Sequence, residues 1–269
     1  MWNGFSVYRD GPVDRVTLDR PARLNAIDPA MALDLGRYFR GLEADEACRV
    51  VTLRGTGRAF CAGVDITAAN EVPAERRWGD GGVAAELAIQ RVNRDFILAM
   101  RRCPQPIVAE LHGVACGAGF ALALAADIRI ARSDARMNCA FVQVGLGGCD
   151  IGVSYLLPRL INAAVASRLI LTGAFLGAEE AARLGLVTMA DDDETLAATS
   201  AETVTALLRV APIALRLSKD ALNVALDAPS IEAAVALEDR NQVLCARTAD
   251  YHEAMAAFRE RRVPQWSGQ

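Results

Sequence analysis

The sequence predicts an α/β core followed by a helical C-terminal region, and three observations support this fold class. In the first half of the 269 residues, short apolar runs rich in β-branched residues alternate with longer segments of helical periodicity. From Val153 onward the helical pattern continues almost without interruption. Hydrophobic residues make up 52% of the chain and charged residues 23%, which is typical of a globular protein with a sizeable core.

Local patterns predict the elements in order. Asp28-Pro29 predicts the start of a helix that runs to about Leu42, because Asp is a good N-cap and Pro fits the first turn. Asp191 to Asp193 predict another helix start, since acidic side chains suit the positive end of the helix dipole. Further helices are expected at residues 86–100 and 113–126, and strands at residues 13–18, 50–53, 107–111 and 128–130.

Charge and cysteine content argue against several classes of protein. The 29 basic and 33 acidic residues give a net charge of −4, so we expect no nucleic-acid partner. Seven cysteines at scattered spacing indicate reduced thiols in a cytoplasmic protein. With two histidines and no ligand spacing, no metal site is expected. The N-terminus lacks signal-peptide features and no apolar run reaches the length of a membrane span, so no membrane partner is expected.

Two stretches combine glycine with small side chains, at residues 58–66 and 113–119. Small side chains leave backbone N–H groups accessible. The second stretch runs into a predicted helix, whose first N–H groups lack internal partners and whose dipole favours negative charge. Two such N–H groups directed at one point form an oxyanion hole. Each turn alone is more simply a tight connection, whereas the pair favours a site that stabilises a negatively charged oxygen.

Five sequence blocks occur in order over nearly the whole chain. They are Asp19-Arg20-Pro21-Ala22-Arg23-Leu24-Asn25-Ala26, then Ala59 to Ile66, His112 to Ile128, Val144 to Leu160, and Leu171-Thr172-Gly173 with Ala178 to Val187. In these blocks the sequence resembles the crotonase superfamily, the enoyl-CoA hydratase/isomerase family. The resemblance implies a crotonase-like spiral of ββα units over residues 1–195. It also implies a helical C-terminal region over residues 196–269 that forms a homotrimer or a dimer of trimers.

The resemblance further implies an acyl-CoA substrate, with coenzyme A as part of the substrate and no separate cofactor. Carried over by position, the backbone N–H groups of Ala62 and Ala118 become the two oxyanion donors. The hydratases of the family use two glutamates for acid–base chemistry. Here the matching positions hold Ala121 and Phe141, which can neither activate water nor deliver a proton.

One acid remains near the expected site. Asp150 lies just before a predicted helix at residues 153–160, and some family members with other chemistry place an active-site Asp in this region. As the acid/base, Asp150 would move a proton between carbons. The alternative is that Asp150 is only the N-cap of that helix, a position that Asp favours.

The same resemblance places side chains against the CoA. The residues expected at the substrate are Arg23, Ala26, Ala62, Asp65 and Ile66, with Asp65 mainly fixing its loop. Arg261 and Arg262 are expected to pair with a CoA phosphate of the same or a neighbouring subunit, or else to form a solvated cationic helix end.

Other residues near these blocks receive packing or specificity roles. Cys61 and Cys116 flank the expected donors and are interpreted as packing residues, and His112 as a group that stabilises its turn. The segment of residues 68–96, which includes Trp78, is expected to select the acyl group.

Three functions remain open from the sequence. Retained oxyanion turns without the glutamates favour an enoyl-CoA double-bond isomerase in which Asp150 is the acid/base. The second is an enoyl-CoA hydratase, or an acyl-CoA hydrolase or dehalogenase-like enzyme, in which Asp150 activates water. The third is a non-catalytic CoA-binding protein that kept the fold.

Overall fold

The computed structural model describes residues 2–68 and 82–269. The strands are Phe5–Asp10 (β1), Val13–Leu18 (β2), Val50–Gly55 (β3), Ile107–Leu111 (β4), Val114–Cys116 (β5), Ile128–Arg132 (β6), Arg136–Asn138 (β7), Leu176–Gly177 (β8) and Thr188–Ala190 (β9). The α-helices are Pro29–Gly41 (α1), Val83–Arg102 (α2), Ala118–Ala125 (α3), Val153–Leu160 (α4), Ala163–Thr172 (α5), Ala178–Arg183 (α6), Asp193–Leu208 (α7), Pro212–Ala225 (α8), Ile231–Ala246 (α9) and Ala249–Glu260 (α10).

Two sheets organise the core. The larger sheet has the strand order β1-β2-β3-β4-β6-β9, in which β1 pairs antiparallel with β2 and the other neighbours are parallel. The smaller sheet has the order β5-β7-β8. The predicted α/β class and the four predicted strands are confirmed. The sequence patterns did not identify β1, β5, β7, β8 and β9, because these strands are either largely exposed or only two to three residues long.

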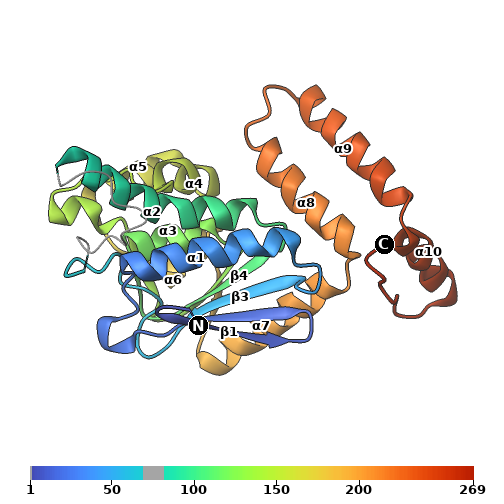
Figure 1. Cartoon of the computed structure of the whole chain (residues 1–269), viewed down its shortest axis with the longest axis horizontal. Helices are drawn as coiled ribbons and strands as arrows, with labels where there is room; N and C mark the ends of the chain where they lie inside the picture. Colours follow the sequence, from blue (N-terminus) through green and yellow to red (C-terminus); the bar gives the residue numbers. More distant parts are fainter. Residues whose placement is uncertain (1, 69–81) are drawn as a thin grey trace.

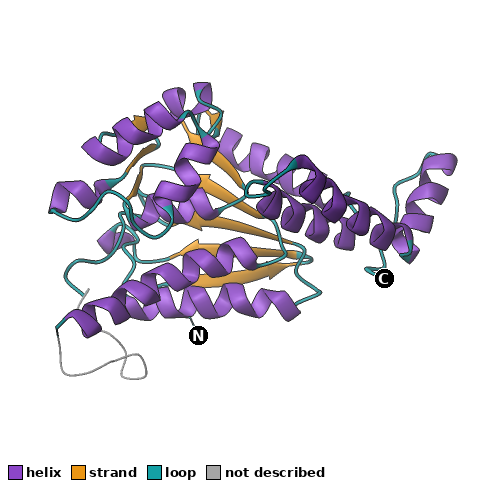
Figure 2. Cartoon of the chain, turned by 90° about the horizontal axis from the view of Figure 1, so that it is seen from above, coloured by secondary structure: helices purple, strands orange, loops and turns teal. Residues whose placement is uncertain are grey.

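Helices cover both faces of the larger sheet, and Figure 2 shows its strands lying between helices. One face packs against α1, α2 and α3 in the main apolar core. The other packs against α7 through a smaller cluster in which Val108 and Ile130 meet Leu196 and Val204. Every residue of α3 is buried, which explains why this helix is apolar on all sides.

The predicted helix starts at Asp28 and in the run from Asp191 are confirmed. The Asp28 carboxylate accepts from Met31 N–H at 2.8 Å and caps α1. Asp192 forms a capping box with Thr195 at the start of α7. The expected boundary at residue 195 falls inside α7, which still packs against the sheet. The helices α8 to α10 project from this core, as Figure 1 shows.

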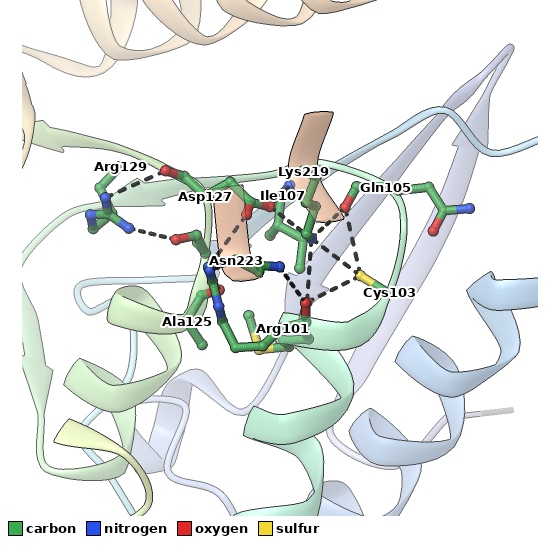
Figure 3. Close-up of polar contacts among 11 residues, drawn as sticks. Arg101, Cys103, Gln105, Ile107, Ala125, Asp127, Arg129, Lys219 and Asn223 are labelled. Carbon is green, nitrogen blue, oxygen red and sulfur yellow. Dashed lines mark hydrogen bonds and ion pairs between the residues drawn. The ribbon is translucent and has the colours of Figure 1, made fainter. Parts of the chain in front are cut away.

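Lys219, the only lysine of the sequence, fastens α8 to the core (Figure 3). Its side chain is 6% exposed, and its ammonium lies 2.8 Å from both an Asp127 carboxylate oxygen and the Gln105 carbonyl oxygen. One turn further along α8, the Asn223 amide donates to the Arg101 carbonyl at 3.0 Å. These contacts satisfy carbonyls at and just beyond the C-terminal end of α2.

We expect Lys219→Met to lower the free energy of unfolding by about 2–3 kcal/mol, because the partly buried Asp127 loses its ammonium partner. Urea denaturation measures this change. The control is Asp220→Ala at the exposed neighbouring position, which should shift the free energy by less than about 0.5 kcal/mol. Equal effects of the two substitutions would contradict the role of Lys219.

Candidate active site

The first backbone turn of the candidate site lies at the start of α3. Gly117 is the N-cap of this helix with φ 50°, and its N–H donates to the Asn138 carbonyl at 2.9 Å. Ala118 is the first helical residue, so its N–H has no intrahelical acceptor. Within residues 2–68 and 82–269, no other acceptor contacts this N–H. The positive end of the helix dipole adds to the attraction for a negatively charged oxygen.

The second turn, residues 59–64, lies directly against the first. Cys116 N–H donates to the Cys61 carbonyl at 3.0 Å, which aligns the two segments like parallel strands. A methyl group on Gly119 would lie 2.2 Å from the Cys61 carbonyl oxygen, so only glycine fits there. Gly63 has φ +107°, and a methyl group on it would lie 3.6 Å from the Ala118 nitrogen. The structure therefore brings the two predicted turns together.

The hydrogen bonds of this turn correct one expected donor. Ala62 N–H donates to the Leu24 carbonyl at 2.9 Å, so the structure does not leave it available for a ligand. Val64 forms a parallel bridge with Ile27. In this bridge Ile27 N–H donates to the Gly63 carbonyl, and the Ile27 carbonyl accepts from Asp65 N–H. Because peptide groups alternate in direction along an extended chain, Val64 N–H points away from Ile27. Among the described residues it has no acceptor, so Val64 replaces Ala62 as the candidate donor of this segment.

The two positions that lack glutamate lie close to these turns. Ala121 follows Ala118 by one helical turn and is fully buried. Phe141 lies in the 3₁₀ helix Ala140–Val144, and its ring is 3.5 Å from where a methyl group on Gly117 would lie. The surroundings of the Ala118 N–H are therefore apolar on the sides where the family's hydratases carry carboxylates.

Asp150 is half-buried in the turn before α4 and is not the N-cap of that helix. Gly152 is the N-cap residue and no side chain caps the helix. The Asp150 carboxylate instead accepts from the Gln90 side-chain amide and, at 2.8 Å, from Ile151 N–H, with both bonds on Oδ1. Ile151 has φ +35°, which is rare for a β-branched residue and marks local backbone strain. The N-cap alternative for Asp150 is therefore wrong.

Asp65 fixes its loop, as expected from the sequence. Its carboxylate accepts from the Thr67 hydroxyl at 2.6 Å and from the Arg20 guanidinium at 2.9 Å. These hydrogen bonds, that of Thr67 foremost, hold the pKa of Asp65 below its usual value. The carboxylate is thus ionised and committed to structural partners.

The other residues expected at the substrate differ in their surroundings. Arg23 ends the exposed 3₁₀ helix Pro21–Arg23, and the Ile66 side chain is 78% exposed. Ala26 is buried, and its carbonyl accepts from Arg20. These residues lie on the segments that carry Leu24 and Val64, at the second turn.

The structure does not bring the two C-terminal arginines to the turns of the same chain. Arg261 is the left-handed C-cap of α10, which lies far from α3 in Figure 1. Arg262 pairs with both carboxylate oxygens of Glu253 and with Glu260. Its guanidinium already has carboxylate partners within α10.

The Cys61 and Cys116 thiols and the His112 ring lie near the turns. Cys61 is fully buried, and desolvation raises the pKa of its thiol to about 12. Burial also raises the pKa of Cys116. The His112 ring nitrogen lies 3.2 Å from the Gly57 carbonyl, and burial lowers the pKa of the imidazole. The burial of Cys61 fits the packing interpretation, whereas Cys116 is half-buried and its packing role stays a prediction. His112 ties its turn to the loop before Ala59.

Sequence reasoning missed two residues, Val64 and Gln90. The direction of the Val64 N–H depends on its pairing with Ile27. Gln90 donates to Asp150, which lies 60 residues further along the sequence. Part of the expected specificity segment, including Trp78, lies outside the described residues.

Metal and membrane sites receive no support from residues 2–68 and 82–269. No group of three or more His, Cys, Asp or Glu side chains in these ranges could hold a metal ion. No helix in the same ranges combines the length and apolar character needed to cross a bilayer.

The fold and the paired turns define an α/β protein of the crotonase class, and comparison with known proteins agrees. The sequence profile described as enoyl-CoA hydratase/isomerase matches residues 9–269. The 1,2-epoxyphenylacetyl-CoA isomerase of Escherichia coli K12 is 36% identical over 255 residues, which cover 94% of each chain. The short-chain-enoyl-CoA hydratase of Clostridium acetobutylicum is 32% identical, covering 97% of this chain and 96% of its own.

Solved structures show the same fold. A crystal structure of enoyl-CoA hydratase from Bacillus anthracis has a TM-score of 0.89 and 28% identity, covering 99% of this chain and 100% of the other. A crystal structure of enoyl-CoA hydratase from Mycobacterium smegmatis has a TM-score of 0.87 and 29% identity, covering 98% of each chain. The chain belongs to the enoyl-CoA hydratase/isomerase family.

We expect brief alkylation at about pH 8 to label Cys149 and to leave Cys61 unmodified. Cys149 is exposed, whereas the buried Cys61 thiol, with its pKa near 12, stays protonated, and alkylation requires the thiolate. Mass spectrometry of peptides after iodoacetamide treatment measures the labelling, and the unfolded protein is the control in which both react. Equal labelling of the native thiols would contradict the packing role of Cys61.

Proposed function

We propose that the protein is an enoyl-CoA isomerase that moves a double bond through a thioester enolate, with Asp150 as the acid/base. The observation that carries the proposal is the pairing of two backbone turns with free N–H groups, while Ala121 and Phe141 stand where hydratases carry glutamates. A double-bond shift needs one group that removes and returns a proton, and it needs no activated water.

The proposed reaction uses a 3-enoyl thioester. Asp150 removes a proton from the carbon next to the carbonyl, and the electron pair moves onto the thioester oxygen. The resulting dienolate oxygen accepts hydrogen bonds from the N–H groups of Val64 and Ala118. The protonated Asp150 then returns the proton at C4, the double bond settles between C2 and C3, and the carboxylate is regenerated.

The names of relatives support more than one activity. The Escherichia coli relative is named an isomerase, and the Clostridium acetobutylicum relative a hydratase. The alternative function is therefore an enoyl-CoA hydratase, or a hydrolase or dehalogenase-like enzyme, in which Asp150 activates water. The exposed Gln90 beside Asp150 favours this alternative, because its amide could also hold a water molecule. A CoA-binding protein without activity is the third outcome that the experiments below distinguish.

Assembly and location are also proposed. Large apolar side chains are exposed on the projecting helices, among them Leu222 on α8, Ile231 on α9 and Phe258 on α10. We propose that they pack in a homotrimer or a dimer of trimers, in which Arg261 could reach a CoA phosphate of a neighbouring subunit. Light scattering tests the assembly. All seven cysteines are free, which fits the reducing cytoplasm.

Ala118→Pro is expected to lower kcat about 100- to 1000-fold, because proline removes one oxyanion donor. Proline is tolerated at the first helical position, so the fold should be retained. Ala118→Gly keeps the N–H and serves as the control, with kcat close to that of the original protein. A folded Ala118→Pro protein with unchanged kcat would exclude this N–H as a donor.

Asp150→Asn is expected to lower turnover about 100- to 10,000-fold, since it removes the acid/base. The original protein is incubated with 2-enoyl-, 3-enoyl- and aryl-CoA thioesters in deuterated and heavy-oxygen water, and mass spectrometry measures the isotope content of the products. Deuterium uptake with double-bond migration and no heavy oxygen supports the isomerase. Heavy-oxygen uptake supports the water-activating alternative, and tight binding without turnover supports the non-catalytic one.

A further inference from the structure

We propose that Gln90 is a positioning residue for Asp150: its side-chain amide holds the carboxylate in one orientation and leaves the second oxygen for proton transfer. This inference rests on the proposed function, which makes Asp150 the acid/base. Gln90 lies on α2, on a different element from the turn that carries Asp150, and no local sequence pattern connects the two.

The hydrogen bonds at Asp150 are arranged asymmetrically. The Gln90 amide and Ile151 N–H both donate to Oδ1. Among the described residues, no donor contacts Oδ2. Two donors on one oxygen restrict rotation of the carboxylate, because turning it would break both bonds. The free oxygen is then held in place as the acceptor for a proton from the substrate.

Neither donor alone defines this orientation. Ile151 N–H belongs to the residue next to Asp150, so it fixes the carboxylate only relative to its own turn. Gln90 ties the same oxygen to α2, and thereby to the main core. Proton transfer requires the base to lie within hydrogen-bond reach of the carbon acid, so a swivelling carboxylate would reach it only part of the time.

Apolar packing, rather than the amide, keeps α2 beside the turn. Ile97 follows Gln90 by seven residues and so lies on the same face of α2. It is buried, and its Cγ2 is 3.8 Å from where a methyl group on Gly152 would lie. Gln90 itself is exposed. A substitution at Gln90 should therefore change the carboxylate without changing the fold.

Gln90→Leu and Gln90→Glu test the proposal with 3-hexenoyl-CoA as substrate. Leucine removes the amide, and glutamate keeps its length while replacing the donor by a carboxylate that repels Asp150. We expect both to lower kcat about 10- to 100-fold, the effect of one hydrogen bond to a charged group. KM should stay within about twofold and Tm within about 2 °C, since Gln90 is not part of the core.

The matched control is Arg94→Leu, one turn further along α2. Arg94 is exposed and pairs with its neighbour Asp95, so the substitution should leave kcat unchanged. Full kcat in Gln90→Glu would overturn the positioning role. So would a loss explained by a lower Tm or a higher KM, which would indicate a structural or binding role.

Asp150→Asn in the same assay separates this inference from the proposed function. If Asp150→Asn is inactive while both Gln90 variants keep full kcat, only the positioning role fails. If Asp150→Asn keeps full kcat, the base itself is wrongly assigned, and the proposed function fails with it.

Discussion

The close approach of two backbone segments, residues 59–64 and 113–119, is the constraint on which the rest of the site depends. The carbonyl oxygen of Cys61 occupies the space that a side chain on Gly119 would need, and Cys116 N–H donates a hydrogen bond to the same carbonyl. No side chain on Gly119 would fit between the segments. The backbone offers donors at this point, since the N–H groups of Val64 and Ala118 have no acceptor among the described residues.

A site built from backbone donors supplies electrostatic stabilisation but no proton acceptor. An acid/base for the proposed reaction must come from another part of the chain, since Ala121 and Phe141 stand where the family's hydratases carry glutamates. Asp150 lies on a separate turn whose geometry places a β-branched residue, Ile151, at positive φ. Strain of this kind persists only where surrounding contacts impose it. Here the hydrogen bonds to the carboxylate and the packing of α2 against the turn are such contacts.

The helix α8 contacts the core through several polar side chains, whereas α9 and α10 extend away from it. Lys219 and Asn223 fasten α8 to the end of α2, as Figure 3 shows, while α10 lies far from α3 (Figure 1). Arg261 and Arg262 are consequently separated from the turns of their own chain. Their expected contact with a CoA phosphate therefore depends on assembly, which also would cover the exposed apolar residues of α8 to α10.

The sequence by itself determined the α/β class, the family, the two glycine-bearing turns and the absence of the two glutamates. These features are local: apolar periodicity, capping residues and glycine positions act over a few residues and can be read in order along the chain. Only the tertiary structure decided that Ala62 N–H donates to the Leu24 carbonyl, while Val64 N–H has no acceptor among the described residues. Likewise, only the packing of α2 brings Gln90 to Asp150. Hydrogen-bond direction and contacts between distant segments depend on how elements pair in space, and no local pattern records that pairing.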